Sequence, residues 1–141
     1  MADAGSPHSA QRESSTALLL AWARGRGRTA FIVMGALPDR AAVTWARGLV
    51  RALSGDVPVA PRQADLLIIL GRVAHKCIPG LIRIHASMMQ PTRVLVVDEG
   101  DPRLSYALAS ATDFVPVDVV VRGLPPAPDA FERALLALEA K

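Results

Sequence analysis

The chain has 141 residues, of which 51% are hydrophobic; this suffices for the core of one domain and argues against a second. Sixteen basic against thirteen acidic side chains give a net charge of +3, an excess too small to indicate a nucleic-acid-binding protein. The single cysteine, Cys77, excludes an internal disulfide and any site built from several thiolates of this chain. The longest apolar runs, Ala17–Ala23 and Leu66–Leu70, are far shorter than the roughly 20 residues of a membrane-spanning helix, so we expect membrane contact only through partner proteins.

Residues 1–14 mix glycine, serine, proline and charged residues without apolar periodicity, which is typical of a disordered arm. From residue 15 to residue 141, compact apolar runs alternate with apolar residues at helical spacing, and this pattern predicts one domain. In chain order the predicted elements are a helix at 15–23, a strand at Thr29–Met34, a helix at 38–53, a strand at Asp65–Leu70, a helix at Lys76–Met89, a strand at Arg93–Val97, a helix at Leu104–Ser110, a strand at Phe114–Val121 and a helix at Asp129–Ala140.

The run Leu66–Leu70 is apolar throughout, which is the pattern of a strand covered on both faces in a parallel sheet. Because strands alternate with helices through short connections, we expect right-handed crossovers. The sequence therefore predicts an α/β fold of three layers, in which helices sandwich a roughly four-stranded parallel sheet in a flavodoxin-like arrangement.

An acidic loop follows the third predicted strand. Ligands of open parallel sheets bind at the carboxyl ends of the strands, so this loop is one of the first places to search for a site. Its carboxylates, Asp98, Glu99 and Asp101, would in principle suit a hard cation such as magnesium. A solvated acidic turn is the interpretation we favour there.

Arginines and glycines alternate in the segment that contains Arg24, Arg26 and Arg28. A phosphate-binding loop of this composition must follow a strand and open a helix, whereas this segment precedes a strand, so the order argues against nucleotide binding. The three arginines remain candidates for contact with a partner protein or with lipid headgroups. No interleaved aromatic platform for single-stranded nucleic acid accompanies them, and we predict no nucleic-acid partner.

Two histidines and the cysteine are the remaining candidates for chemistry. His75 and His85 are ten residues apart, which is not the spacing of a helical metal-ligand pair, so we interpret them as ordinary surface or partly buried side chains. Cys77 lies at the apolar start of a predicted helix and could act as an activated thiolate, but a small buried hydrophobe is the interpretation we favour. The residues alone thus indicate a binding-class α/β domain.

Two segments resemble a known family. Pro61–Val73 resembles the Pro-Arg-x-Ala-Asp, apolar strand, Gly-Arg-Val segment of the B subunit of respiratory complex I, the NADH-quinone oxidoreductase. Val115–Ala130 resembles the same family's Val-Pro-Val-Asp-Val-x-Val-x-Gly-Cys-Pro-Pro-x-Pro-Glu-Ala segment. The family includes relatives in membrane-bound nickel–iron hydrogenases, and the resemblance implies a subunit of an electron-transport assembly.

The resemblance also implies a cofactor, because four family thiolates bind a 4Fe–4S cluster. At the approximate positions of those cysteines this chain has Pro38, Asp39, Gly100 and Leu124. Cys77 falls where the family usually has methionine, so it is no substitute ligand. We therefore expect no cofactor, and specifically no iron–sulfur cluster, in this chain.

The hypothesis that follows is a cluster-free structural or accessory subunit of a complex I-related assembly, with no expected activity alone. The resemblance implies as partners a large catalytic subunit and membrane-arm subunits, and a peripheral location on the inner, cytoplasmic face of the cell membrane. One alternative is a true electron-transfer subunit whose 4Fe–4S cluster is held partly by a partner chain. A second is a freestanding small-ligand or metal-binding module that uses Asp98, Glu99 and Asp101.

Overall fold

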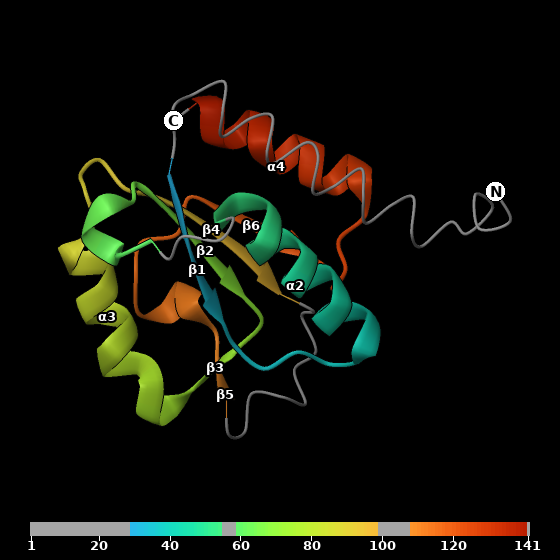
Figure 1. The fold of residues 1–141 in the computed structure, drawn as a ribbon, viewed down its shortest axis with the longest axis horizontal. Helices are drawn as coiled ribbons and strands as arrows, with labels where there is room; N and C mark the ends of the chain where they lie inside the picture. Colours follow the sequence, from blue (N-terminus) through green and yellow to red (C-terminus); the bar gives the residue numbers. More distant parts are fainter. Residues whose placement is uncertain (1–28, 55–58, 99–107, 141) are drawn as a thin grey trace, which may run out of the picture.

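The computed structural model describes residues 29–54, 59–98 and 108–140 (Figure 1). Several predictions fall outside these ranges: the disordered arm, the first predicted helix, the arginines Arg24, Arg26 and Arg28, and the loop residues Glu99, Gly100 and Asp101. Among the described residues, none of the helices has the length and apolar character that a bilayer crossing requires.

A four-stranded parallel sheet forms the centre of the molecule. Its strands lie in the order β1 (Ala30–Met34), β2 (Leu66–Leu70), β4 (Arg93–Asp98) and β6 (Val119–Arg122). All five residues of β2 are buried, as the uninterrupted apolar run predicts for a central strand covered on both faces. The predicted α/β class and four-stranded parallel sheet are confirmed.

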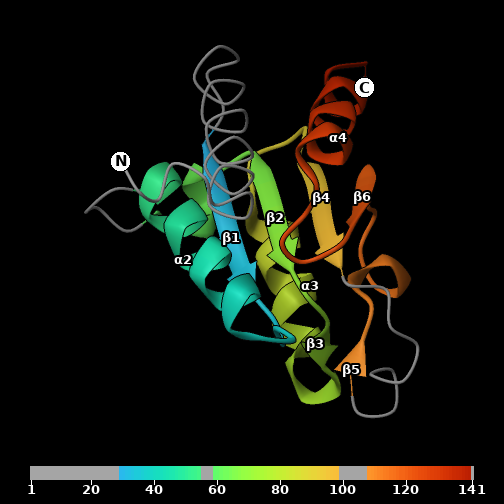
Figure 2. The same ribbon diagram turned by 90° about the vertical axis from the view of Figure 1, so that its right-hand side faces the viewer.

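Helices cover both faces of the sheet and make three layers (Figure 2). On one face lie α2 (Arg40–Ser54) and α4 (Pro128–Ala140), whose buried side chains join one hydrophobic cluster with Leu66, Ile68 and Leu70. On the other face lies α3 (Ile78–Ser87), which joins a second cluster with Leu67 and Ile69. Successive residues of β2 therefore pack on opposite layers, as the pleat of a strand requires.

Two predicted elements differ in the structure. The helix predicted at Leu104–Ser110 is wrong at its described end, because β5 (Leu108–Ala109) pairs antiparallel with β3 (Val73–Ala74). The backbone hydrogen bonds of this small sheet join residues distant in sequence, so local apolar spacing did not indicate it. The strand predicted from Phe114 begins only at Val119, after a 3-10 turn at Ala111–Asp113.

The late start of β6 has a local cause. Pro116 has no backbone N–H to give to a neighbouring strand. The pairing with β4 then opens on Asp118, whose Oδ2 accepts a hydrogen bond of 2.8 Å from the backbone N–H of Val94. In return the N–H of Asp118 donates to the carbonyl of Val94 at 3.0 Å. This reciprocal contact sets the register of β6 against β4.

Candidate functional site

The carboxyl ends of the four parallel strands form the edge at which ligands of such sheets bind, and we call it the strand-end edge. The loops after β1 and β2 are pressed together there. The N–H of Gly35 donates to the carbonyl of Leu70 at 2.7 Å, and the N–H of Ala36 donates to that of Arg72 at 2.8 Å. Gly71 has φ of +84°, and a Cβ on it would collide with the Ala36 carbonyl, so only glycine fits.

Arg72 and Asp98 form an ion pair at this edge. Nε of Arg72 lies 3.6 Å from Oδ1 of Asp98, and the two side chains are 12% and 6% exposed. Asp98 is the one charged residue among the described residues that is fully buried. The solvated acidic turn favoured from the sequence is therefore wrong for Asp98, because this residue ends β4 and its carboxylate faces a guanidinium.

Backbone hydrogen bonds extend this contact across the sheet. The N–H of Gly71 donates to the carbonyl of Val97 at 2.7 Å, and the N–H of Gly123 donates to the carbonyl of Asp98 at 2.8 Å. With the bonds from Gly35 and Ala36, these contacts join the ends of β1, β2, β4 and β6 to one another. The strand ends at this edge are thus linked to one another by hydrogen bonds within the chain.

Pro38 and Asp39, at the approximate positions of two family cysteines, open helix α2. Both are exposed, and Oδ1 of Asp39 accepts a hydrogen bond of 2.9 Å from the N–H of Ala42. This is the geometry of an N-cap, which satisfies a backbone donor of the first helical turn. The Asp39 carboxylate therefore has a structural role in starting α2.

Leu124, at the position of a third family cysteine, points into the core. It is 8% exposed and belongs to the hydrophobic cluster under α2 and α4. Gly123 before it adopts φ of +107°, a conformation that glycine takes without strain. The turn at residues 123–126 thus has the glycine and prolines of the family segment, while the side chain of Leu124 packs in the hydrophobic core.

The described residues do not fit an iron–sulfur cluster. Such a cluster needs thiolate ligands, whereas the three described positions carry a proline ring, a capping carboxylate and a buried leucine. Among the described residues no group of three or more histidine, cysteine, aspartate or glutamate side chains lies close enough to hold a metal ion. The described side chains of this edge make structural contacts: an ion pair, a helix cap and core packing.

The other sequence candidates are two histidines and the cysteine. His75 precedes α3 and His85 lies in its last turn, so the structure does not bring them together as a ligand pair. Cys77 is exposed, and the interpretation of it as a buried hydrophobe is wrong. Sequence reasoning also missed Arg72, although a cation and an anion placed directly after adjacent apolar strands were a readable signal.

The fold and the strand-end edge together define a three-layer, flavodoxin-like α/β domain whose parallel strands are joined at their carboxyl ends. No family model matches the sequence. The chain is 40% identical over 87 residues to the B 1 subunit of the NADH-quinone oxidoreductase of Herpetosiphon aurantiacus, a match that covers 58% of this chain and 49% of that protein. It is 39% identical over 87 residues to the B subunit of the same enzyme in Rhodococcus opacus, with 58% and 47% covered.

The B subunit of the Bdellovibrio bacteriovorus enzyme is 35% identical over 85 residues, which cover 57% of this chain and 46% of that one. The chain thus spans about half the length of the curated relatives that it matches. The similarity to the complex I B subunit, predicted from the two sequence segments, is confirmed by these relatives.

One solved structure shares the fold. It is that of the membrane-bound sulfane sulfur reductase, an archaeal respiratory membrane complex, and a chain of it superposes with a TM-score of 0.56 at 22% identity. The superposition covers 87% of this chain and 76% of the other. The α/β architecture is therefore one that a respiratory membrane complex also contains.

Proposed function

We propose that this protein is a structural or accessory subunit of a complex I-related membrane assembly, and that it keeps the scaffold of the B subunit without an iron–sulfur cluster. The observation that carries the proposal is the burial of Leu124 in the core, at the position where the family resemblance places a cluster thiolate. A leucine side chain cannot ligate iron, and exchange of this one for a ligand would leave a hole in the core.

The strand-end edge supports the same proposal. In the family, thiolates from loops at this edge hold the cluster, so the cluster also joins those loops. Here the ion pair between Arg72 and Asp98 and the hydrogen bonds of Ala36 and Gly123 join the corresponding strand ends. A chain that closes this edge with its own groups has a stable scaffold without a cofactor.

The proposed partners follow from the relatives. Those relatives are named as B subunits of NADH-quinone oxidoreductase, and the solved structure is a respiratory membrane complex. We infer that this chain docks on a large catalytic subunit and on membrane-arm subunits, at the cytoplasmic face of the cell membrane. Its membrane contact is made through those partners, with the Arg24, Arg26 and Arg28 segment as the candidate contact.

Anaerobic purification followed by iron and acid-labile sulfide analysis tests the cluster-free state. We expect substoichiometric iron and sulfide in the chain purified alone and no absorbance of an iron–sulfur cluster. A full 4Fe–4S cluster in the isolated chain contradicts the proposal. A cluster found only when a partner chain co-purifies favours the electron-transfer alternative.

The assembly itself is tested by co-purification from membranes with mass spectrometry. We expect hydrogenase-type or complex I-type large and membrane-arm subunits in near-equal amounts with this chain. Recovery of the chain only as a free monomer counts against the proposal.

The metal-module alternative is less well supported, because the carboxylate of Asp98 already faces Arg72. Calorimetric titration with magnesium or manganese should give no binding heat.

A further inference from the structure

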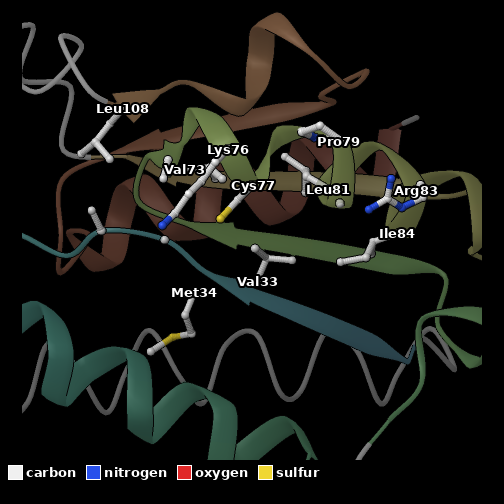
Figure 3. A pocket seen from close by; sticks show the side chains of 14 residues that line it. Val33, Met34, Val73, Lys76, Cys77, Pro79, Leu81, Arg83, Ile84 and Leu108 are labelled. Carbon is white, nitrogen blue, oxygen red and sulfur yellow. The ribbon is translucent and has the colours of Figure 1, made fainter.

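A hollow lies on the opposite side of the sheet from α2 and α4, between α3 and the edge strand β1 (Figure 3). Its volume is about 510 Å³, within the range of roughly 300–1,000 Å³ that is typical of small-molecule sites. Val33 of β1, with Gly35 and Ala36 after the strand, lines one side, Leu81 and Ile84 of α3 line the other, and Leu108 of β5 closes one end. We call it the α3 pocket.

Two cations flank this apolar lining. Figure 3 shows Lys76 toward one end of the α3 pocket and Arg83 toward the other, with Cys77 and Val33 between them. Both cationic side chains belong to exposed residues, and neither forms an ion pair or a hydrogen bond with another described residue. The charge of the pocket rim is therefore available to a ligand.

No acidic side chain is among the described residues that line the α3 pocket. From Leu66 to Val97 the sequence has no aspartate or glutamate, so β2 and α3 carry no acid, and the one acid of β4 is Asp98 at its end, which pairs with Arg72. The described part of the β1 segment, Thr29–Ala36, has no charged residue at all.

From this geometry we propose that the α3 pocket binds an anionic amphiphile, a molecule with one alkyl chain and a carboxylate or similar anionic head. The alkyl chain lies along the apolar side chains of β1 and α3, where it loses contact with water. The head lies against Lys76 or Arg83 at the rim. This binding does not depend on the proposed role in an assembly, and it names a ligand class for a pocket that borders the strand-end edge at Gly35 and Ala36.

Decanoate, well below its micelle-forming concentration, is the probe for this proposal, and the full-length chain is the protein. Decyltrimethylammonium has the same alkyl chain with a positive head, so it separates head recognition from simple apolar adsorption. Calorimetry should give saturable binding of decanoate and at least tenfold weaker binding of the cation. Equal binding of the two, or no binding of decanoate, overturns the proposal.

Gly80 offers a variant that adds a side chain to the lining of the α3 pocket, at a position with open space for it. It lines the pocket, and a Cβ built on it meets no heavy atom within 4 Å. Gly80→Leu should therefore abolish decanoate binding while the helix remains intact. Gly48→Leu on α2 is the matched control, because a Cβ there also meets nothing within 4 Å but the residue is not part of this pocket. Unchanged binding by Gly80→Leu overturns the location of the site.

The rim cations are tested separately. Because exposed charge pairs contribute little, Lys76→Gln and Arg83→Gln together should weaken decanoate binding by up to about tenfold, and added salt should weaken it in the wild type. Cys77 gives an independent readout, because it lines the pocket and is the only cysteine of the chain. Decanoate should slow its alkylation by iodoacetamide in the wild type and in Gly48→Leu. No protection of the wild type contradicts the proposal.

Discussion

Trp45 of α2 and Phe131 of α4 meet edge to face, with their ring centroids 6.1 Å apart and their planes at 87°. This contact joins two helices that are separated by most of the chain. Both side chains are almost completely buried in the cluster on one face of the sheet. Edge-to-face aromatic pairs of this kind contribute beyond the area that they bury.

Replacement of Phe131 by alanine should therefore lower the free energy of unfolding by about 3–5 kcal/mol, because it leaves a cavity between the two helices and the sheet. Urea unfolding followed by circular dichroism measures the change. Leu136→Ala is the control on the same helix, since Leu136 is 59% exposed and its loss should cost at most about 0.5 kcal/mol. Equal effects of the two variants would mean that α4 does not pack as described.

The Arg72–Asp98 pair allows a double-mutant cycle. Asp98→Ala leaves a mostly buried guanidinium without its anion, and we expect a loss of roughly 3–5 kcal/mol in the free energy of unfolding. Adding Arg72→Met should recover part of that loss, so that the coupling energy is about 0.5–3 kcal/mol. The exposed pair of Asp129 and Arg133 is the comparison, with a coupling of at most about 0.5 kcal/mol. Additive single effects at Arg72 and Asp98 would contradict their contact.

Gly71 should not tolerate a side chain. Alanine there would be strained at φ of +84°, and its Cβ would collide with the Ala36 carbonyl, so we expect Gly71→Ala to destabilise the chain by at least about 1 kcal/mol. Gly48→Ala lies in the middle of α2 with open space around it and should instead stabilise by about 0.5–1 kcal/mol. Thermal unfolding of the two variants measures the change in melting temperature, which should fall for Gly71→Ala and rise for Gly48→Ala. A lower melting temperature for Gly48→Ala would contradict the prediction.

The N-cap of α2 gives a test with a conservative rescue. Asp39→Ala removes the acceptor for the Ala42 N–H and should cost about 1 kcal/mol, whereas Asp39→Asn retains an acceptor and should cost much less. The free energies of unfolding of both variants are measured under the same conditions. If both variants behave alike, the side chain of Asp39 does not cap the helix.

The sequence predicted the four-stranded parallel sheet because its strands are runs such as Leu66–Leu70, whose apolar character reflects burial on two faces. It failed where long-range pairing decides the local structure. Leu108 and Ala109 belong to an apolar stretch, but the partner that makes them a strand is Val73–Ala74. The pattern of one segment does not contain that partner.

At the candidate site the sequence predicted where residues lie in the fold more successfully than whether their side chains are buried or exposed. Asp98 was assigned to a solvated turn, yet it is buried because it ends β4, a central strand, and faces Arg72, which follows the neighbouring strand β2. Cys77 was assigned to the core, yet it is exposed because helix α3 begins one residue later, at Ile78. A shift of one residue at a helix start or a strand end exchanges a buried side chain for an exposed one.

The hydrogen bonds and the ion pair at the strand-end edge have a consequence for how this chain matures. They form from groups that every newly made copy already carries, so these contacts between the four strand ends contain no iron or sulfide. The described domain should therefore reach its folded state in air, in the presence of a chelator and in a host that lacks machinery for cluster synthesis. In the proposed cluster-free state, production of the chain would depend on translation and folding alone, without the oxygen sensitivity of iron–sulfur proteins.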